Sequence, residues 1–215
     1  MAGRKPASIL LLAVSKTRPA LDVLEAIQCG QRAFGENYVQ EGIGKIEAVR
    51  RLLPPGDTPP IWHFIGPLQG NKTRQVAENF DWVHSIDRLK IAERLSAQRP
   101  STLPPLEVCV QVNISGEESK SGVSPAEAGT LCRAVAALPR LRLRGLMAIP
   151  APAANEEEAR RPFARLRHLL EALQTEGLPL DVLSMGMSHD LAAAIHEGAT
   201  LVRVGTAIFG EREKQ

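Results

Sequence analysis

Short apolar segments alternate with amphipathic segments along almost the whole chain, and this alternation limits the fold more than any other feature. Eight segments have the length and continuous hydrophobicity of buried parallel strands. They are residues 8–16, 33–37, 62–66, 82–86, 107–114, 143–149, 182–187 and 201–205. Eight such strands with helical patterns between them, in 215 residues, predict a single (β/α)8 TIM barrel of the α/β class.

Helical patterns occupy residues 19–29, 39–53, 71–79, 87–98, 124–138, 156–176 and 188–197. Gly30 stops the first, Asp87 is expected to cap the fourth, and Ser124 with Pro125 opens the fifth. A doubly wound sheet stays open as an alternative, because alternation alone does not show that the sheet closes. No GxGxxG or GxxxxGK[ST] motif is present, which argues against a dinucleotide or P-loop site.

Composition predicts one soluble domain over residues 1–215, in a chain that is short for two domains. The formal net charge is +2, so bulk electrostatics predict no nucleic-acid partner. The apolar run at residues 9–14 is too short to span a bilayer and lacks a secretory cleavage site, which predicts a cytoplasmic protein without a membrane partner. The three cysteines, Cys29, Cys109 and Cys132, have no metal-site spacing, so we expect reduced, buried thiols and no metal.

Polar residues follow several of the predicted strands, at the end of a barrel where chemistry is found. Lys16 ends the first strand, in the run Ile-Leu-Leu-Leu-Ala-Val-Ser-Lys. One interpretation is a solvated strand end. The other interpretation is a lysine at the mouth of the barrel, in surroundings of low dielectric constant. Such surroundings disfavour the ammonium form, so that the neutral amine can react with a carbonyl.

Two glycine-containing turns follow the last two strands, where many barrels bind phosphate. Ser188 ends the first turn, and Gly205 with Thr206 forms the second. Glycine lets the backbone approach an anion closely, and small hydroxyls donate to it. Ser188 could instead cap its helix and Gly205 could simply permit a turn, but the two turns together favour phosphate.

Two further polar residues lie within predicted strands. Arg203 interrupts the apolar run 201–204, and a buried arginine needs a partner. That partner is either a ligand or a carboxylate inside the barrel. His63 is either a pocket residue or a core histidine satisfied by a backbone group.

Six ordered motifs closely resemble the YggS/PROSC family of pyridoxal phosphate homeostasis proteins. They are LLAVSKT (residues 11–17), FGENYVQE (34–41), WHFIGPLQGNK (62–72), RGLMAIP (144–150), SMGMSHD (184–190) and VRVGTAIFG (202–210). The resemblance covers nearly the whole chain. It implies one barrel of the kind found in the N-terminal domain of alanine racemase, with fold type III binding of pyridoxal 5′-phosphate (PLP). Family members usually carry a helix before the first strand, which this sequence is expected to lack.

The resemblance also assigns roles to individual residues. Lys16 would hold PLP covalently as a Schiff base, with Asn37 in contact nearby. Ser188, Gly205 and Thr206 would hold the phosphate. Arg203 would face the pyridine nitrogen, and His63 and Met147 would line the pocket.

The same resemblance indicates cofactor storage and delivery for vitamin B6 homeostasis in place of catalysis. An arginine stays charged and keeps the pyridine nitrogen unprotonated, which makes the ring a weaker electron sink. Tyr38 is the only tyrosine, and the β-domain that brings the second base of alanine racemases is not expected here. We therefore expect a monomeric PLP carrier and no catalytic residues.

Three alternatives to the carrier remain open at this stage. They are a weak PLP-dependent amino-acid racemase, a module that docks apo PLP-dependent enzymes, and a phosphate-binding barrel without PLP.

Overall fold

The protein is a closed barrel of eight parallel strands, seen in a computed structural model that describes residues 3–117 and 120–211. The strands are β1 (Leu10–Val14), β2 (Ala33–Glu36), β3 (Ile61–Phe64), β4 (Trp82–Ile86), β5 (Leu106–Gln111), β6 (Leu141–Met147), β7 (Val182–Ser184) and β8 (Leu201–Val204). Each strand pairs with its neighbours in sequence, and β1 pairs with β8 in parallel to close the ring. The predicted TIM barrel is confirmed, and the open doubly wound sheet is excluded.

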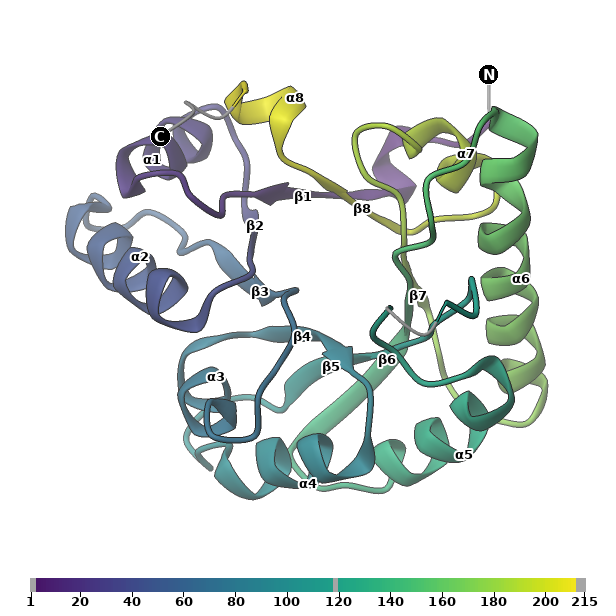
Figure 1. Cartoon of the computed structure of the whole chain (residues 1–215). Helices are drawn as coiled ribbons and strands as arrows, with labels where there is room; N and C mark the ends of the chain where they lie inside the picture. The colour runs from purple at the N-terminus through teal and green to yellow at the C-terminus, as the bar shows by residue number, and fades with distance from the viewer. Residues whose placement is uncertain (1–2, 118–119, 212–215) are drawn as a thin grey trace.

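Helices surround the ring of strands, with the short α8 placed near α1 (Figure 1). They are η1 (Pro6–Ser8), α1 (Ala20–Gln28), α2 (Val39–Leu52), α3 (Thr73–Asn79), α4 (Leu89–Gln98), α5 (Pro125–Ala136), α6 (Glu156–Thr175), α7 (Leu191–His196) and α8 (Thr206–Phe209). None of the helices in the described part of the chain combines the length and apolar character needed to span a bilayer.

The first residues of three helices can be compared with the predicted starts. One start is confirmed and two are wrong. Ser124 and Pro125 open α5 as expected. Asp87 does not cap α4, because Arg88 occupies the cap position and Asp87 pairs with its guanidinium instead. The predicted helix at residues 188–197 begins only at Leu191, since a turn occupies the residues before it.

The core has an inner and an outer layer because successive strand residues point to opposite faces. The larger cluster packs the strands against the helices and includes Phe34, Phe64 and Phe163. A smaller cluster includes Leu12, Cys109 and Met147.

Two of the three cysteines are buried as predicted, and the third is not. Cys109 and Cys132 are buried, whereas Cys29 is exposed just after the end of α1. The prediction was wrong for Cys29 because it directly follows the last helical residue, outside the packed face. All three cysteines are free thiols.

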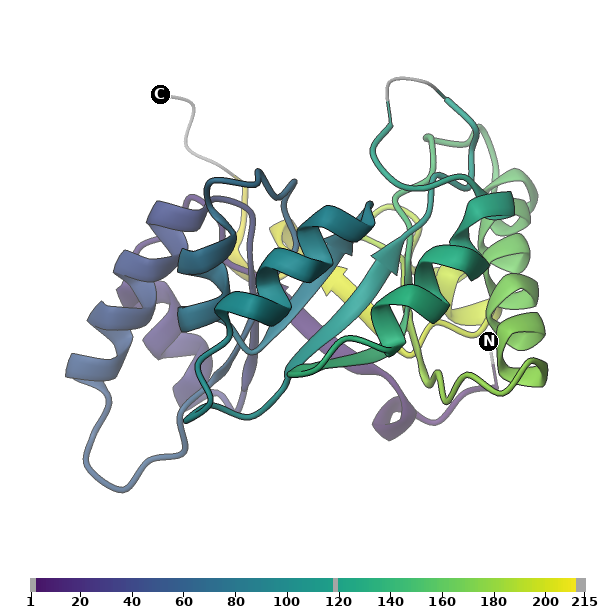
Figure 2. The same ribbon diagram turned by 90° about the horizontal axis from the view of Figure 1, so that it is seen from below.

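The two ends of the barrel differ in character (Figure 2). The proline-rich loop between α2 and β3 projects from one end, and the loops that follow β5 and β6 project from the other. The second end carries the polar residues that follow the strands. It is therefore the end where a barrel of this kind places its chemistry.

Candidate functional site

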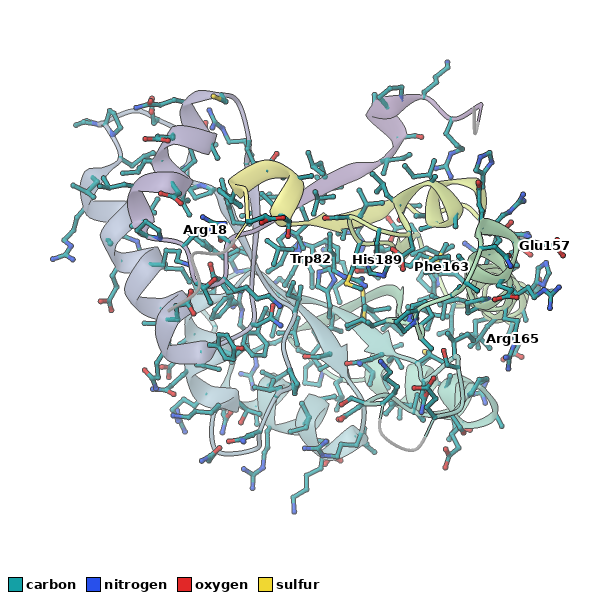
Figure 3. The ribbon with its side chains drawn as sticks, turned by 45° about the horizontal axis from the view of Figure 1, so that its top comes forward. Arg18, Trp82, Glu157, Phe163, Arg165 and His189 are labelled. Atoms are coloured by element: carbon teal, nitrogen blue, oxygen red, sulfur yellow. The ribbon has the colours of Figure 1, made fainter. Side chains whose placement is uncertain are left out.

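A cavity of about 250 Å³ opens at the end of the barrel where the strands finish. Its lining includes Lys16, Asn37, Ser188, Arg203, Gly205 and Thr206. The structure thus brings together six of the eight residues singled out from the sequence. Arg18 and His189 also line it, and Figure 3 labels Arg18 beside α8 and His189 nearer α7.

The turn that carries Lys16 is held from below by a buried network. Lys45 Nζ donates to the carbonyl oxygen of Ser15 over 2.6 Å and to Glu36 Oε1 over 2.6 Å. Ser15 Oγ donates to the same carboxylate oxygen at 2.6 Å. The residue after Lys16, Thr17, has a φ of 64°, and its N–H donates to Glu41. Lys16 itself is half-buried at the cavity.

Glu36 and Lys45 form an ion pair almost completely removed from water. Their exposures are 0% and 5%. Burial raises the pKa of Glu36, and the adjacent Lys45 ammonium opposes this rise without cancelling it. Such a pair is costly to bury and costly to break, so its presence directly under the Lys16 turn indicates a fixed geometry there.

The turn after β8 lies beside the Lys16 turn, because β8 pairs with β1 in parallel. Gly205 follows β8, and Thr206 begins α8 with its side chain exposed at the cavity. Arg18 reaches across and donates from Nη2 to the carbonyl oxygens of Gly210 and Glu211, over 2.6 and 2.8 Å. This contact joins the segment after α8 to the segment after β1.

Ser188 lies in the turn that delays the start of α7. The N–H of Met187 donates to Asp190 Oδ1 at 2.6 Å, and Asp190 takes the cap position of α7. Ser188 is therefore not the helix cap that the alternative interpretation proposed. It is exposed at the edge of the cavity, with Gly205 and Thr206 also in the lining.

Asn37 is fixed by an unusually close backbone approach. A Cβ atom on Gly66 would lie 2.1 Å from the carbonyl oxygen of Asn37, so only glycine fits there. The side-chain atom Asn37 Oδ1 is buried and has no hydrogen-bond partner within the described residues. A buried polar atom without a partner, in a residue that lines a cavity, suits contact with a polar ligand.

Arg203 is 4% exposed and is held by neutral oxygens. Nη1 donates to the carbonyl oxygen and to Oγ of Ser184, at 2.7 and 2.8 Å, and Nη2 donates to the carbonyl oxygen of Ala148 at 2.9 Å. No carboxylate in residues 3–117 and 120–211 forms an ion pair with it, so the predicted alternative of a buried carboxylate partner is not found. Burial lowers the pKa of Arg203 to about 10, which leaves it charged at neutral pH.

His63 and Met147 lie in the barrel interior and are not part of the cavity lining. His63 is 1% exposed, and its Nδ1 lies 2.9 Å from Nε2 of His84. Its partner is thus a second histidine, where the sequence suggested a backbone group. Met147 is fully buried among apolar residues that include Leu12 and Cys109.

Sequence reasoning missed three residues that shape the site. Arg18 lies two residues after Lys16, and Gly66 lies three residues after His63. The roles of Arg18 and Gly66 depend on contacts with residues distant in sequence, which the sequence does not show. Lys45 lies in an amphipathic helix and resembles an ordinary surface lysine. Only the spacing Glu41–Lys45, one turn of helix, hinted at an ion pair.

The comparisons with known proteins agree with this geometry. Residues 5–213 match the family of alanine racemase N-terminal domains, and the chain belongs to that family. Within it, the chain is 60% identical over 212 residues to the pyridoxal phosphate homeostasis protein of Pseudomonas aeruginosa, covering 99% of this chain and 88% of that protein. The Escherichia coli K12 protein of the same name is 59% identical over 214 residues, covering 98% and 89%.

Solved structures give the same assignment. PipY of Synechococcus elongatus, in a structure with PLP bound, superposes with a TM-score of 0.86 at 38% identity, covering 96% of this chain and 95% of PipY. Alanine racemase of Clostridium difficile superposes with a TM-score of 0.74 at 16% identity, over 98% of this chain and 55% of the racemase. The second likeness shows a shared fold alone.

Proposed function

We propose that this protein binds pyridoxal 5′-phosphate in the cavity, through a Schiff-base linkage to Lys16, and stores and delivers it for intracellular PLP homeostasis. The observation that carries the proposal is the lining of one cavity by an amine and two small hydroxyls from different strand ends, Lys16, Ser188 and Thr206. The relatives named pyridoxal phosphate homeostasis proteins and the PLP-bound PipY structure support the same cofactor.

The residues present fit each chemical part of PLP. Ser188 and Thr206 offer hydroxyl donors to a phosphate, and Gly205 leaves its backbone open to it. Asn37 Oδ1 has no partner among the described residues and would take a polar contact near Lys16. Arg203 would donate to the ring nitrogen from a guanidinium already held in place.

When bound, PLP supplies an aldehyde that condenses with a primary amine and releases one water. The chain's own residues favour holding the cofactor over using it. Arg203 can only donate hydrogen bonds, so it leaves the ring nitrogen unprotonated and weakens the ring as an electron sink. Tyr38 is 57% exposed and lies outside the cavity lining. In this position it would not supply a second base to a ligand in the cavity.

Delivery needs a recipient, and we propose apo PLP-dependent enzymes of the cytoplasm as the partners. We also propose that the chain acts as a single-domain monomer, with His63 and Met147 supporting the site from the barrel interior. Size-exclusion chromatography with light scattering, with and without an apo-enzyme, measures both the mass of the carrier and any complex. A stable dimer of the carrier alone would contradict the monomer.

The absorbance spectrum before and after borohydride reduction tests the attachment to Lys16. We expect a visible band that reduction removes, with the reduced cofactor mapped by mass spectrometry to the peptide containing Lys16. Lys16→Ala should abolish the band, while Lys90→Ala, an exposed lysine on α4, should keep it. A protein that stays colourless after incubation with PLP would overturn the proposal.

Turnover separates storage from catalysis. The holoprotein is mixed with a panel of L- and D-amino acids, and chiral chromatography follows their interconversion. We expect no conversion at ordinary enzymatic rates of about 1–10³ s⁻¹. Conversion at such rates would make the protein a racemase and refute the carrier role.

A further inference from the structure

A row of polar side chains runs through the interior of the barrel away from Arg203. Arg203 Nη1 donates to Ser184 Oγ at 2.8 Å, and Ser184 Oγ lies 2.8 Å from Nδ1 of His84. Nε2 of His84 lies 2.9 Å from Nδ1 of His63. All four residues are less than 5% exposed, so these bonds form in a low-dielectric interior, where they are strong and costly to lose.

The direction of these hydrogen bonds follows from Arg203, because a guanidinium donates and never accepts. Ser184 Oγ must therefore accept from Arg203. Its own proton has one acceptor within reach in the described residues, the unprotonated Nδ1 of His84. His84 then carries its proton on Nε2 and donates it to Nδ1 of His63.

The reverse direction leaves more groups unsatisfied. If His84 donated from Nδ1, the Ser184 hydroxyl proton would have no acceptor in the described residues, and His63 Nε2 would be a buried lone pair without a donor. In the favoured direction only the N–H at His63 Nε2 lacks a partner there. An unmade hydrogen bond in a buried interior is costly, so the direction with fewer unmade bonds is the favoured one.

Both rings are held neutral and in place. Burial lowers the pKa of His63 to about 3, and burial, His63 and the Arg203 charge lower the pKa of His84 well below its usual value. The His63 ring stacks on Trp82, with centroids 5.2 Å apart and planes inclined by 16°. The row therefore starts at the fixed ring of His63, which sets the tautomer of His84. The tautomer of His84 in turn sets the direction of the Ser184 hydroxyl.

We propose that His84 is a positioning residue that fixes the Arg203 guanidinium by orienting the Ser184 hydroxyl. Because Nδ1 of His84 accepts the hydroxyl proton, a lone pair of Ser184 Oγ points to Arg203 Nη1. His63 completes the arrangement by selecting the Nε2–H tautomer of His84. The proposal rests on the proposed function, in which Arg203 faces the ring nitrogen of PLP.

Paired substitutions at His84 test the role. His84→Leu removes the acceptor at similar size, and His84→Asn keeps a side-chain oxygen near the place of Nδ1. We expect His84→Leu to release PLP about tenfold faster, the equivalent of one hydrogen bond of about 1.4 kcal/mol, and to shift the visible band. His84→Asn should bring the release rate to within about twofold of the unmodified protein and return the visible band to its position. The control His168→Leu removes an exposed histidine of α6 and should change neither.

Equal release rates and spectra for His84→Leu and the unmodified protein would refute the positioning role. Equal loss in His84→Leu and His84→Asn would also refute it, because a merely structural role predicts no rescue by an acceptor.

Nitrogen-15 NMR of the cofactor-free, unmodified protein gives a second readout that needs no substitution to fold and no PLP. We expect both His63 and His84 to show an unprotonated Nδ1 and a protonated Nε2. A proton on Nδ1 of His84 would reverse the row and overturn the proposal. Failure of PLP to colour the unmodified protein would overturn the proposed function instead, and the tautomers would still show whether His84 orients Ser184 toward Arg203.

Discussion

Lys45 Nζ lies 2.6 Å from Glu36 Oε1, and both side chains are buried beneath the turn that carries Lys16. Removing the cation alone leaves an uncompensated buried carboxylate. We therefore expect Lys45→Met to lower the free energy of unfolding by about 3–5 kcal/mol in denaturant titrations.

Two comparisons test that explanation. The double variant Lys45→Met/Glu36→Gln should lose less than Lys45→Met alone, because the stranded charge is gone. Arg133→Met breaks an ion pair with Glu176 whose side chains are both about half exposed, and it should cost less than about 1 kcal/mol. A double variant less stable than Lys45→Met would contradict the role of the stranded carboxylate.

The two buried histidines predict a loss of stability in acid. Burial lowers the pKa of His63 to about 3 and that of His84 well below 6.5. Below pH 6.5 the unfolded chain binds protons that the folded protein does not. The free energy of unfolding should therefore fall with decreasing pH, by up to about 1.4 kcal/mol per pH unit for each histidine. For His63 this fall continues toward pH 3.

Urea unfolding at pH 7, 6 and 5 measures the slope. Glu36 acts in the opposite direction, because its raised pKa favours the folded state at low pH, so the informative quantity is a difference between variants. His63→Gln/His84→Asn should flatten the slope, and His168→Asn should reduce it far less. An unchanged slope in the double variant would rule out the histidines as its source.

Replacement by alanine should have opposite effects at two glycines, Gly66 and Gly44. Gly66→Ala places a Cβ 2.1 Å from the backbone oxygen of Asn37, so it should destabilise the fold by about 1–3 kcal/mol or more and weaken PLP binding. Gly44→Ala, within α2 and with no atom within 4 Å of the new Cβ, should stabilise by about 0.5–1 kcal/mol. Thermal and denaturant unfolding with PLP titration check both, and a tolerated Gly66→Ala would contradict the close approach.

The proposed phosphate contacts predict a ligand-dependent effect. Ser188→Ala and Thr206→Val should weaken PLP binding about tenfold each, because a hydrogen bond to a charged group is worth about 1.5–3 kcal/mol. Pyridoxal, which lacks the phosphate, should bind both variants as it binds the unmodified protein. Ser101→Ala and Thr102→Val, at exposed positions, are the matched controls. Equal weakening for PLP and pyridoxal would place the phosphate elsewhere.

Thiol reactivity checks the packing around the three cysteines. Cys29 is exposed and should react with a thiol reagent within minutes in the native protein. Cys109 and Cys132 are buried, and burial raises the pKa of Cys132 to about 12, so neither should react until the protein unfolds. Mass spectrometry of the labelled protein should show one modified cysteine before unfolding and three after it. Rapid labelling of Cys132 in the native state would contradict the packing of α5.

The barrel was predictable because each strand and helix carries its own periodic pattern, and eight strand–helix units leave few other ways to pack. Ser188, Gly205 and Arg203 could be placed at one end because strand ends meet there. The network of Lys45 with Glu36 could not, since the sequence does not show which face of α2 turns inward at the Lys16 turn. The pairing of His63 with His84 depends on the inward pointing of residues on neighbouring strands, and the start of α7 depends on a turn made by Asp190.

The closure of the barrel between β1 and β8 has a consequence for synthesis. Lys16 follows β1 and Gly205 follows β8, so the cavity spans the seam between the two strands whose pairing closes the barrel. A nascent chain that still lacks β8 cannot close the barrel, and it has only part of the cavity lining. If the proposed function holds, a chain translated only through β7 would lack Gly205 and Thr206, which belong to the proposed phosphate site.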